Sequence, residues 1–161
     1  MSVLIEGARV EELGECLQLI KRSVAQLAGS SYTREQVDAW LDHYPDSAEF
    51  AKWGRFRTTL VARDEGRLVG FGQVDLGRRE IEGIHVDPDR ARDGIGRRLL
   101  AEMEDVVVAA GLRDVQVQAS LNAEGFYAAC GYATVEQISF RCRNGVLLNA
   151  LLMQKSLALA G

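Results

Sequence analysis

The sequence has few of the residues that disulfide-linked or metal-binding proteins depend on. Its three cysteines, Cys16, Cys130 and Cys142, are odd in number and show no Cys-x-x-Cys spacing, so they do not predict a disulfide framework. The chain has only two histidines, His43 and His85, which together with these cysteines cannot form a zinc-binding pattern. We therefore expect no metal, and reduced thiols in a cytoplasmic protein.

Long apolar runs and an excess of basic charge are also missing. No stretch approaches the roughly 18 apolar residues that a membrane span needs. The N-terminus turns acidic at Glu6 and lacks the basic region of a signal peptide. The formal net charge of −4 is opposite to that of most nucleic-acid-binding proteins. We therefore expect neither a membrane nor a nucleic acid as partner, and the local basic cluster at residues 90–98 favours a small anionic ligand.

Length and composition indicate one globular domain over residues 1–161. Hydrophobic residues make up 47% of the chain and charged residues 26%, as is usual for a protein with a buried core. β-rich runs predict strands at 3–6, 59–63, 68–75, 80–86, 115–119, 134–142 and 146–155. Helical spacing and capping residues predict helices at 13–29, 36–43, 46–53, 95–110 and 122–129. This order predicts an α/β protein, a mixed sheet with helices on both faces.

The most informative segment joins the strand at 80–86 to the helix at 95–110 through a polar turn that contains glycine. This order directs free backbone N–H groups and the positive end of a helix dipole at one point, which suits a phosphate or pyrophosphate. The segment is not a dinucleotide fingerprint, because Leu99 stands where the third glycine would be. Arg97 and Arg98 lie at the positive end of this dipole, where each would destabilise the helix by roughly 0.3–1 kcal/mol unless an anion binds there. Alternatively both are solvated, and Arg98 pairs with Glu102.

This segment resembles the acyl-CoA loop of the GNAT acetyltransferases, Val-x-Pro-x-x-(Arg/Gln)-x-x-Gly-x-(Gly/Ala). The matching positions are occupied by Val86, Pro88, Gly94 and Gly96. Ala91 stands at the Arg/Gln position, and Arg92 stands where many members have a further glycine. The order of strands and helices also agrees with the GNAT layout, so the resemblance covers essentially the whole chain. It implies a mixed, mostly antiparallel sheet of about seven strands.

A second segment, residues 120–132, resembles the other signature of the same family, an Asn followed by Phe-Tyr and Gly-(Phe/Tyr). The matching residues are Asn122, Phe126, Tyr127, Gly131 and Tyr132. Adjacent helical residues lie about 100° apart, so Phe126 is expected to pack inward while Tyr127 points elsewhere. A phenol titrates near ~10, close to an alkyl thiol. The resemblance implies that Tyr127 is the general acid for the thiolate of coenzyme A. Asn122 is expected either to bind the pantetheine arm or to cap the helix.

The strand before the loop offers candidate bases. The period of two of a strand predicts one shared face for Glu80, Glu82, Ile84 and Val86. His85 is expected on the opposite face unless a bulge re-aims its side chain. A carboxylate can accept the proton that an ammonium group loses before the amine attacks a thioester. The family often has an acidic residue in this role on this strand, so Glu82 is the expected base and Glu80 the alternate. The alternative for both glutamates is that they lie at a solvated strand end and have no catalytic role.

The resemblance implies acetyl-CoA as co-substrate, with its pyrophosphate on the loop and its pantetheine along the strand. The expected cofactor-binding residues are Ile84, His85, Val86, Ala91, Arg92, Asp93, Gly94, Ile95, Gly96, Arg97, Asn122 and Tyr127. A backbone N–H near Val86 would polarise the thioester carbonyl. The amine would attack directly, so no covalent enzyme intermediate and no cysteine is needed.

The acceptor side carries aromatic and acidic residues between positions 32 and 53. They are Tyr32, Trp40, Tyr44, Phe50 and Trp53, with Asp38, Asp42, Asp46 and Glu49. This combination suits a cationic amine, or else a core of aromatic residues under a solvated acidic face. The expected function is an N-acetyltransferase for a primary amine of a small molecule or an exposed amino group. The alternative is a non-catalytic acyl-CoA-binding sensor, and O-acetyl transfer or a larger acyl donor also stays open. The final strand is a candidate for pairing in a homodimer.

Overall fold

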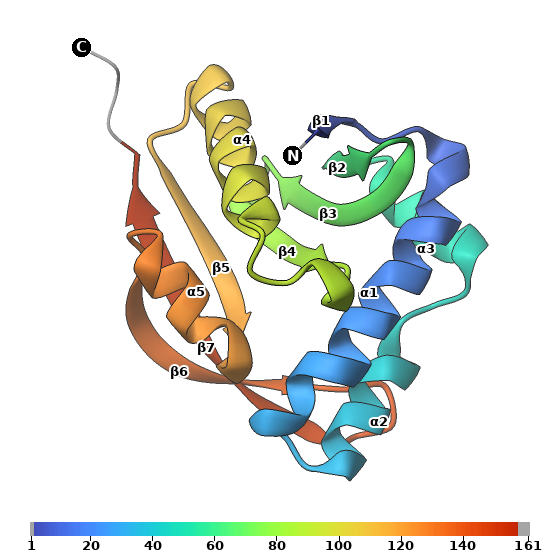
Figure 1. Cartoon of the computed structure of the whole chain (residues 1–161). Coiled ribbons are helices and arrows are strands. Elements are labelled where there is room, and N and C mark those ends of the chain that lie inside the picture. The colour runs from blue at the N-terminus through green and yellow to red at the C-terminus, as the bar shows by residue number, and fades with distance from the viewer. Residues whose placement is uncertain (1, 158–161) are drawn as a thin grey trace.

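The computed structural model describes residues 2–157, which contain a seven-stranded sheet (Figure 1). The strands lie in the order β1-β2-β3-β4-β5-β7-β6, and all neighbours are antiparallel except β4 and β5. Their bounds are β1 Val3–Gly7, β2 Thr58–Asp64, β3 Arg67–Asp75, β4 Glu80–Val86, β5 Asp114–Ser120, β6 Ala133–Arg141 and β7 Leu147–Ser156. The mixed, mostly antiparallel sheet expected from the sequence is confirmed.

Helices cover both faces of this sheet, also as expected (Figure 1). They are α1 Leu13–Leu27, α2 Arg34–His43, α3 Ser47–Gly54, α4 Ile95–Ala109 and α5 Glu124–Ala129. Helices α1, α2 and α3 share one buried cluster with β2 and β3, whereas α4 and α5 share another with β5 and β7. Within residues 2–157, no helix combines the length and the apolar character needed to cross a membrane.

Local sequence signals fix the ends of several helices. Thr33 begins α2 with a capping box, in which its Oγ1 accepts from Gln36 N and its N–H donates to Gln36 Oε1. Gly111 follows α4 in the left-handed conformation that is common at the end of a helix. The segment at 121–123 differs from expectation, because it forms a 3₁₀ turn and α5 begins only at Glu124.

Strands β4 and β5 separate soon after they pair. Only Glu80 with Gln116 and Ile81 with Val117 are partners across this parallel pair. Beyond Ile81, the edge of β4 that faces β5 therefore has no strand partner. Its backbone N–H and C=O groups at residues 82–86 remain available for a ligand in the opening between the strands.

A bulge in β4 changes which of its side chains share a face. Gln73 in β3 pairs with Gly83, but the next residue, Val74, pairs with Ile81, so Glu82 is the extra residue. Ile81 consequently packs on the α4 side together with Ile84. The expected single face for Glu80, Glu82, Ile84 and Val86 is wrong, because the bulge places the two glutamates on the face opposite Ile84 and Val86, with Glu82 towards Arg57 and Glu80 in register with Asp75.

The free edges of the sheet also differ from expectation. The final strand, β7, is paired on both sides, with β5 and with β6. The edge strand at this end of the sheet is β6, whose side chains are largely exposed. The expectation that the last strand is free to pair in a homodimer is therefore wrong, because the hairpin at Asn144-Gly145 places β6 outside it.

Candidate active site

The loop between β4 and α4 presents backbone N–H groups that have no partner. Gly94 is the N-cap of α4 and has a φ of 79°, a left-handed conformation that glycine adopts without strain. The N–H groups of residues 94–97 donate to no acceptor within residues 2–157. Because these donors lie at the positive end of the α4 dipole, this end of the helix is suited to an anion.

The loop borders a cavity of about 430 Å³, which we name the loop cavity. Nearly all the expected cofactor-binding residues line this cavity, namely Ile84, His85, Val86, Ala91, Arg92, Gly94, Ile95, Gly96, Arg97, Asn122 and Tyr127. Asp93 does not line it; its carboxylate accepts a hydrogen bond from Arg90 Nε at 2.8 Å. The structure thus brings together the two segments that the sequence singled out.

Close packing behind the loop leaves little room for a side chain at position 96. A Cβ there would lie 3.2 Å from Phe126 Cε1 and 3.5 Å from Val86 Cγ2. Phe126 is only partly buried, whereas Tyr127 is 4% exposed and packs edge-on against Phe126 and Tyr132. The expected orientation of the Phe-Tyr pair is therefore wrong: Tyr127 is the more buried ring, because α5 lies with that face on the sheet.

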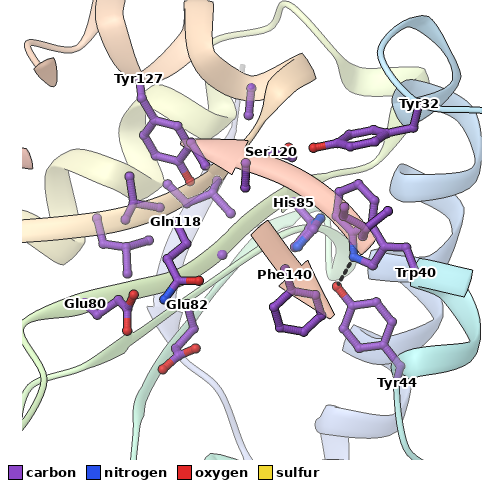
Figure 2. Close-up of a pocket in the computed structure, with 18 of the residues that line it drawn as sticks. Tyr32, Trp40, Tyr44, Glu80, Glu82, His85, Gln118, Ser120, Tyr127 and Phe140 are labelled. Atoms are coloured by element: carbon purple, nitrogen blue, oxygen red, sulfur yellow. Dashed lines mark hydrogen bonds between the residues drawn. The ribbon is translucent and has the colours of Figure 1, made fainter. Parts of the chain in front are cut away.

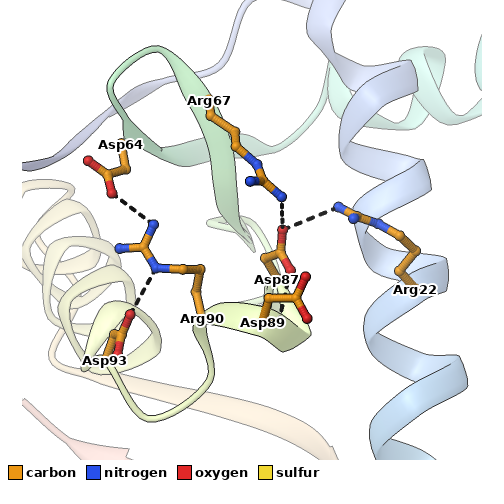
Figure 3. A network of polar contacts seen from close by, with 7 residues as sticks. All are labelled: Arg22, Asp64, Arg67, Asp87, Asp89, Arg90 and Asp93. Atoms are coloured by element: carbon orange, nitrogen blue, oxygen red, sulfur yellow. Dashed lines mark hydrogen bonds and ion pairs between the residues drawn. The ribbon is translucent and has the colours of Figure 1, made fainter.

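Asp87 anchors the start of the loop (Figure 3). Its buried carboxylate accepts from Asp89 N at 3.0 Å, which caps the short turn at 88–90. The same carboxylate pairs with Arg67 at 3.3 Å and with Arg22 of α1 at 3.6 Å. The loop is therefore tied to α1 and to the first residue of β3 before it turns towards α4.

Arginines of the basic cluster have different tasks. Arg90 pairs with Asp93 and with Asp64 of β2, both at 2.8 Å, so it supports the loop (Figure 3). The alternative in which Arg98 pairs with Glu102 is wrong. Arg98 instead donates to Val3 O at 3.1 Å, because β1 lies beside this turn of α4. Arg92 and Arg97 line the loop cavity, and neither forms a hydrogen bond or ion pair within the described part of the chain.

Arg92 also departs from ordinary backbone geometry. Its φ of 73° lies in the left-handed region, which costs a residue with a side chain roughly 1–2 kcal/mol. Many GNAT sequences have a glycine at this position of the loop motif. The loop therefore keeps the conformation that glycine would allow, while a guanidinium group is added at the cavity wall.

A second cavity of about 480 Å³, the central cavity, is shown in Figure 2. It lies where β4 and β5 diverge and shares part of its lining with the loop cavity. Its walls carry the candidate acid and bases and the aromatic residues, including Tyr32, Trp40, Tyr44, Glu80, Glu82, His85, Gln118, Tyr127 and Phe140. Ile84, His85 and Tyr127 border both cavities. The proton donor and the proton acceptors suggested by the sequence therefore face one space.

Tyr127 extends its ring from α5 so that the hydroxyl points into the central cavity (Figure 2). The hydroxyl has no hydrogen-bond partner within residues 2–157. Burial raises the pKa of this phenol above its usual value, because the phenolate would lose its hydration. Tyr127 is consequently protonated at neutral pH and able to donate.

The two glutamates of β4 differ in access and in charge environment. Burial raises the pKa of Glu82, and the Arg57 guanidinium, with Nε 3.5 Å from Oε1, opposes part of that rise. Glu80 is 3% exposed and pairs with Arg78 at 3.3 Å. Its second oxygen is buried without a partner in the described structure. Glu82 is the more accessible carboxylate and the stronger candidate base.

His85 lies where the cavities meet. It borders the loop cavity and the central cavity and faces the same side of β4 as Gly83. Burial lowers the pKa of His85 to about 4, so its imidazole is neutral near pH 7. His85 lies opposite Ile84 and Val86, as expected, but the bulge places Glu80 and Glu82 on the same face as His85.

Tyr32 connects the acceptor side of the site to the acid-bearing segment. Its hydroxyl donates to Asn149 O of β7 at 2.7 Å and accepts from Leu121 N at 2.9 Å. Its ring meets Trp40 edge-on, with the centroids 5.7 Å apart. The sequence indicated an aromatic residue here, but nothing local signalled these two bonds. Asn122, next to Leu121, caps no helix, because Ala123 is the N-cap of α5; the pantetheine contact stays a prediction.

A third cavity of about 490 Å³, the aromatic cavity, lies on the α1–α3 side of β4. Its lining includes Trp40, Tyr44, Trp53, Phe56, Arg57, Asp75, Glu82, Gly83, His85 and Phe140. The acids expected from the helices are not part of it: Asp38, Asp42, Asp46 and Glu49 line none of the three cavities. Phe50 borders it but belongs chiefly to the core. Asp75 and Glu82, on strands, supply the negative charge. No cluster within residues 2–157 could hold a metal ion.

Comparisons with known proteins agree with this architecture. The family model of the acetyltransferase (GNAT) domain matches residues 29–157. A mycothiol acetyltransferase of Clavibacter michiganensis is 34% identical over 113 residues, which cover 58% of this chain but only 37% of that protein. An uncharacterized N-acetyltransferase of Escherichia coli, YafP, is 26% identical over 83% of both chains.

Solved structures show the same fold. A GCN5-related N-acetyltransferase from Rhodopseudomonas palustris superposes with a TM-score of 0.92 at 29% identity, covering 98% of this chain and 97% of that one. The PaiA N-acetyltransferase of Thermoplasma acidophilum, solved with coenzyme A, has a TM-score of 0.77 at 18% identity over 97% of this chain and 99% of its own. With its loop, sheet and matching family model, the chain belongs to the GNAT acetyltransferase family of enzymes.

Proposed function

We propose that this protein is an acetyl-CoA-dependent N-acetyltransferase that acts on a primary amine. The observation that carries the proposal is that the loop cavity and the central cavity meet along Ile84, His85 and Tyr127. Glu80 and Glu82 border the same central cavity from β4. A proton donor, a proton acceptor and an anion-binding loop therefore surround adjoining spaces, as acyl transfer from a thioester to an amine requires.

The loop and the open edge of β4 fit acetyl-CoA. The N–H groups of residues 94–97 would bind the pyrophosphate, and Arg92 and Arg97 would add positive charge at the cavity wall. The unpaired edge of β4 at residues 82–86 would bond to the amides of the pantetheine arm, and Asn122 would contact the same arm. The coenzyme A in the T. acidophilum PaiA structure supports this cofactor on this fold.

The transfer would proceed by direct attack. Glu82 accepts a proton from the acceptor's ammonium group, directly or through one water molecule. The amine nitrogen then bonds to the thioester carbonyl carbon, while a backbone N–H near Val86 stabilises the charge on the carbonyl oxygen. As the carbon–sulfur bond breaks, Tyr127 gives its proton to the departing sulfur. The nitrogen, which carries two hydrogens after its attack, loses one of them to the Tyr127 phenolate, directly or through water, so that the amide is neutral and the phenol is restored. No covalent enzyme intermediate forms, so the cysteines have no part in this mechanism.

Cofactor binding is the first test. Calorimetric titration with acetyl-CoA, coenzyme A and dephospho-coenzyme A should give micromolar binding of acetyl-CoA. Absence of binding at millimolar cofactor would mean that Ala91 and Arg92 disable the loop, and the proposal would fall. Binding without thiol release for any amine would instead support the non-catalytic sensor.

Tyr127→Phe tests the acid. This variant should lower kcat by about 10²-fold or more, the usual contribution of a general acid, with little change in the Kd for acetyl-CoA. Tyr132→Phe is the matched control. This phenol packs edge-on against Tyr127 and belongs to the same buried cluster, but its hydroxyl donates to Glu104 and it lines none of the three cavities. The kcat of this control should stay at the parent value. Equal losses in both variants would remove Tyr127 from the mechanism.

A further inference from the structure

The aromatic cavity continues from the place where the amine must react. Trp40, Tyr44, Glu82, His85 and Phe140 border both the central cavity and the aromatic cavity. Gly83 lies between Glu82 and His85 in β4, and a Cβ at this position would lie 3.0 Å from His85 Nε2. The glycine therefore makes room for the imidazole of His85 at the junction, and the shared lining of the two cavities lets a ligand extend from one into the other.

Flat apolar surfaces dominate the outer part of this cavity. Phe56, which follows α3, is 84% exposed, and Phe140 of β6 is 37% exposed. Trp53 lies deeper and packs against Phe50, with the ring centroids 6.3 Å apart. A ligand ring placed here would cover aromatic surface that water now contacts, and ring edges and faces attract one another specifically.

Charge in the cavity is negative at its inner end. Asp75 and Glu82 are the carboxylates of the lining, and Arg57 is its one guanidinium among the residues described. Arg57 is engaged by Glu82 at 3.5 Å, by Gln73 Oε1 at 3.4 Å and by the Trp53 ring, whose centroid lies 5.9 Å from its Cζ. One ammonium group is therefore matched beside Glu82, whereas a second ammonium further out would meet Arg57 and apolar rings.

We propose that the acceptor is an arylalkylamine, a primary amine joined by a short alkyl chain to an aromatic ring. Its ammonium end lies at Glu82, and its ring lies among Trp53, Phe56 and Phe140. This assignment rests on the proposed acetyl transfer, but binding of the amine does not require the reaction to occur.

Intrinsic fluorescence measures this binding directly, because both tryptophans of the chain, Trp40 and Trp53, line the cavity. The probes are 2-phenylethylamine, its saturated analogue 2-cyclohexylethylamine, and 1,4-diaminobutane, each titrated without acetyl-CoA. We expect saturable binding of 2-phenylethylamine, about threefold tighter than the saturated analogue and about tenfold tighter than the diamine. A diamine that binds as tightly as 2-phenylethylamine, or tighter, would overturn the proposal.

Phe56→Ala locates the ring, because this exposed side chain can be removed without opening the core. We expect it to weaken 2-phenylethylamine binding about fivefold. Val135→Ala is the matched control, since Val135 is also an exposed apolar residue, 55% accessible, on β6 away from all three cavities. Equal affinity in parent, Phe56→Ala and Val135→Ala proteins would overturn the placement.

Thiol release from acetyl-CoA with the same amines separates the two proposals. Release with 2-phenylethylamine supports both. Binding of 2-phenylethylamine without release by any amine overturns the proposed transferase and leaves the ligand class standing. Release with 1,4-diaminobutane but not with 2-phenylethylamine overturns the ligand class and leaves the transferase standing.

Discussion

Replacing Gly94 with alanine separates the backbone conformation of the loop from the other properties of the site. Gly94 has a φ of 79°, and no heavy atom beyond its chain neighbours lies within 4 Å of the position of an added Cβ. The substitution therefore adds the cost of a left-handed alanine, roughly 1–2 kcal/mol. The stiffer unfolded chain offsets about 0.4–1 kcal/mol of this cost. The free energy of unfolding should fall by about 1 kcal/mol and the melting temperature by roughly 2–4 °C.

Gly66 provides an almost identical control. In the turn between β2 and β3 it has a φ of 80°, and again nothing lies within 4 Å of an added Cβ. Gly66 lines none of the three cavities. Gly66→Ala should therefore lower stability as much as Gly94→Ala does. Only Gly94→Ala should weaken acetyl-CoA binding, by about five- to tenfold, because binding must restore the loop conformation that alanine disfavours.

Thermal unfolding and calorimetric titration of the two variants test this reasoning together. A Gly94→Ala protein that binds acetyl-CoA as well as Gly66→Ala does would refute the claim that the N–H groups of residues 94–97 hold the pyrophosphate. Weakened binding in both variants would show that lowered stability, not loop geometry, reduces the affinity.

Three further substitutions, with Tyr132→Phe again as a control, test other parts of the site. Arg57→Met removes the cation 3.5 Å from Glu82 and should raise the pKa of that carboxyl further, so the acid limb of the kcat/KM profile should move to higher pH; an unmoved limb would exclude Glu82 as the base. Tyr32→Phe removes both bonds of a buried hydroxyl and should lower the free energy of unfolding by about 1–3 kcal/mol and also kcat. In Tyr132→Phe we expect a comparable stability loss by urea unfolding, with unchanged kcat. Burial lowers the pKa of His85 to about 4 in the folded protein. As the pH falls, the imidazole of His85 is therefore protonated in the unfolded chain before it is protonated in the folded protein. Stability should therefore be lost as the pH falls from about 6.5 towards 4, and less steeply in His85→Gln, when unfolding is followed by urea titration across this range.

Features set by neighbouring residues could be predicted from the sequence. The capping box at Thr33 and Gln36, the hairpin at Asn144-Gly145 and the glycine N-cap at Gly94 all depend on contacts or torsions within a few residues. The period of the apolar residues likewise predicted the helices and strands and the mixed sheet they build. These signals sufficed to place the end of α4 that presents free N–H groups, because a helix start and its free N–H groups are local properties.

Pairing between distant segments decided the rest. The bulge at Glu82 arises from the register of β4 against β3, which no strand period reveals. Tyr32 reaches Leu121 across 89 residues, and Arg98 reaches Val3 across 95. Side-chain periodicity states which residues can share a face, but partners and bulges depend on how elements dock. The sequence by itself therefore determined the loop and the order of elements, whereas only the tertiary structure decided which carboxylate, phenol and rings meet in one space.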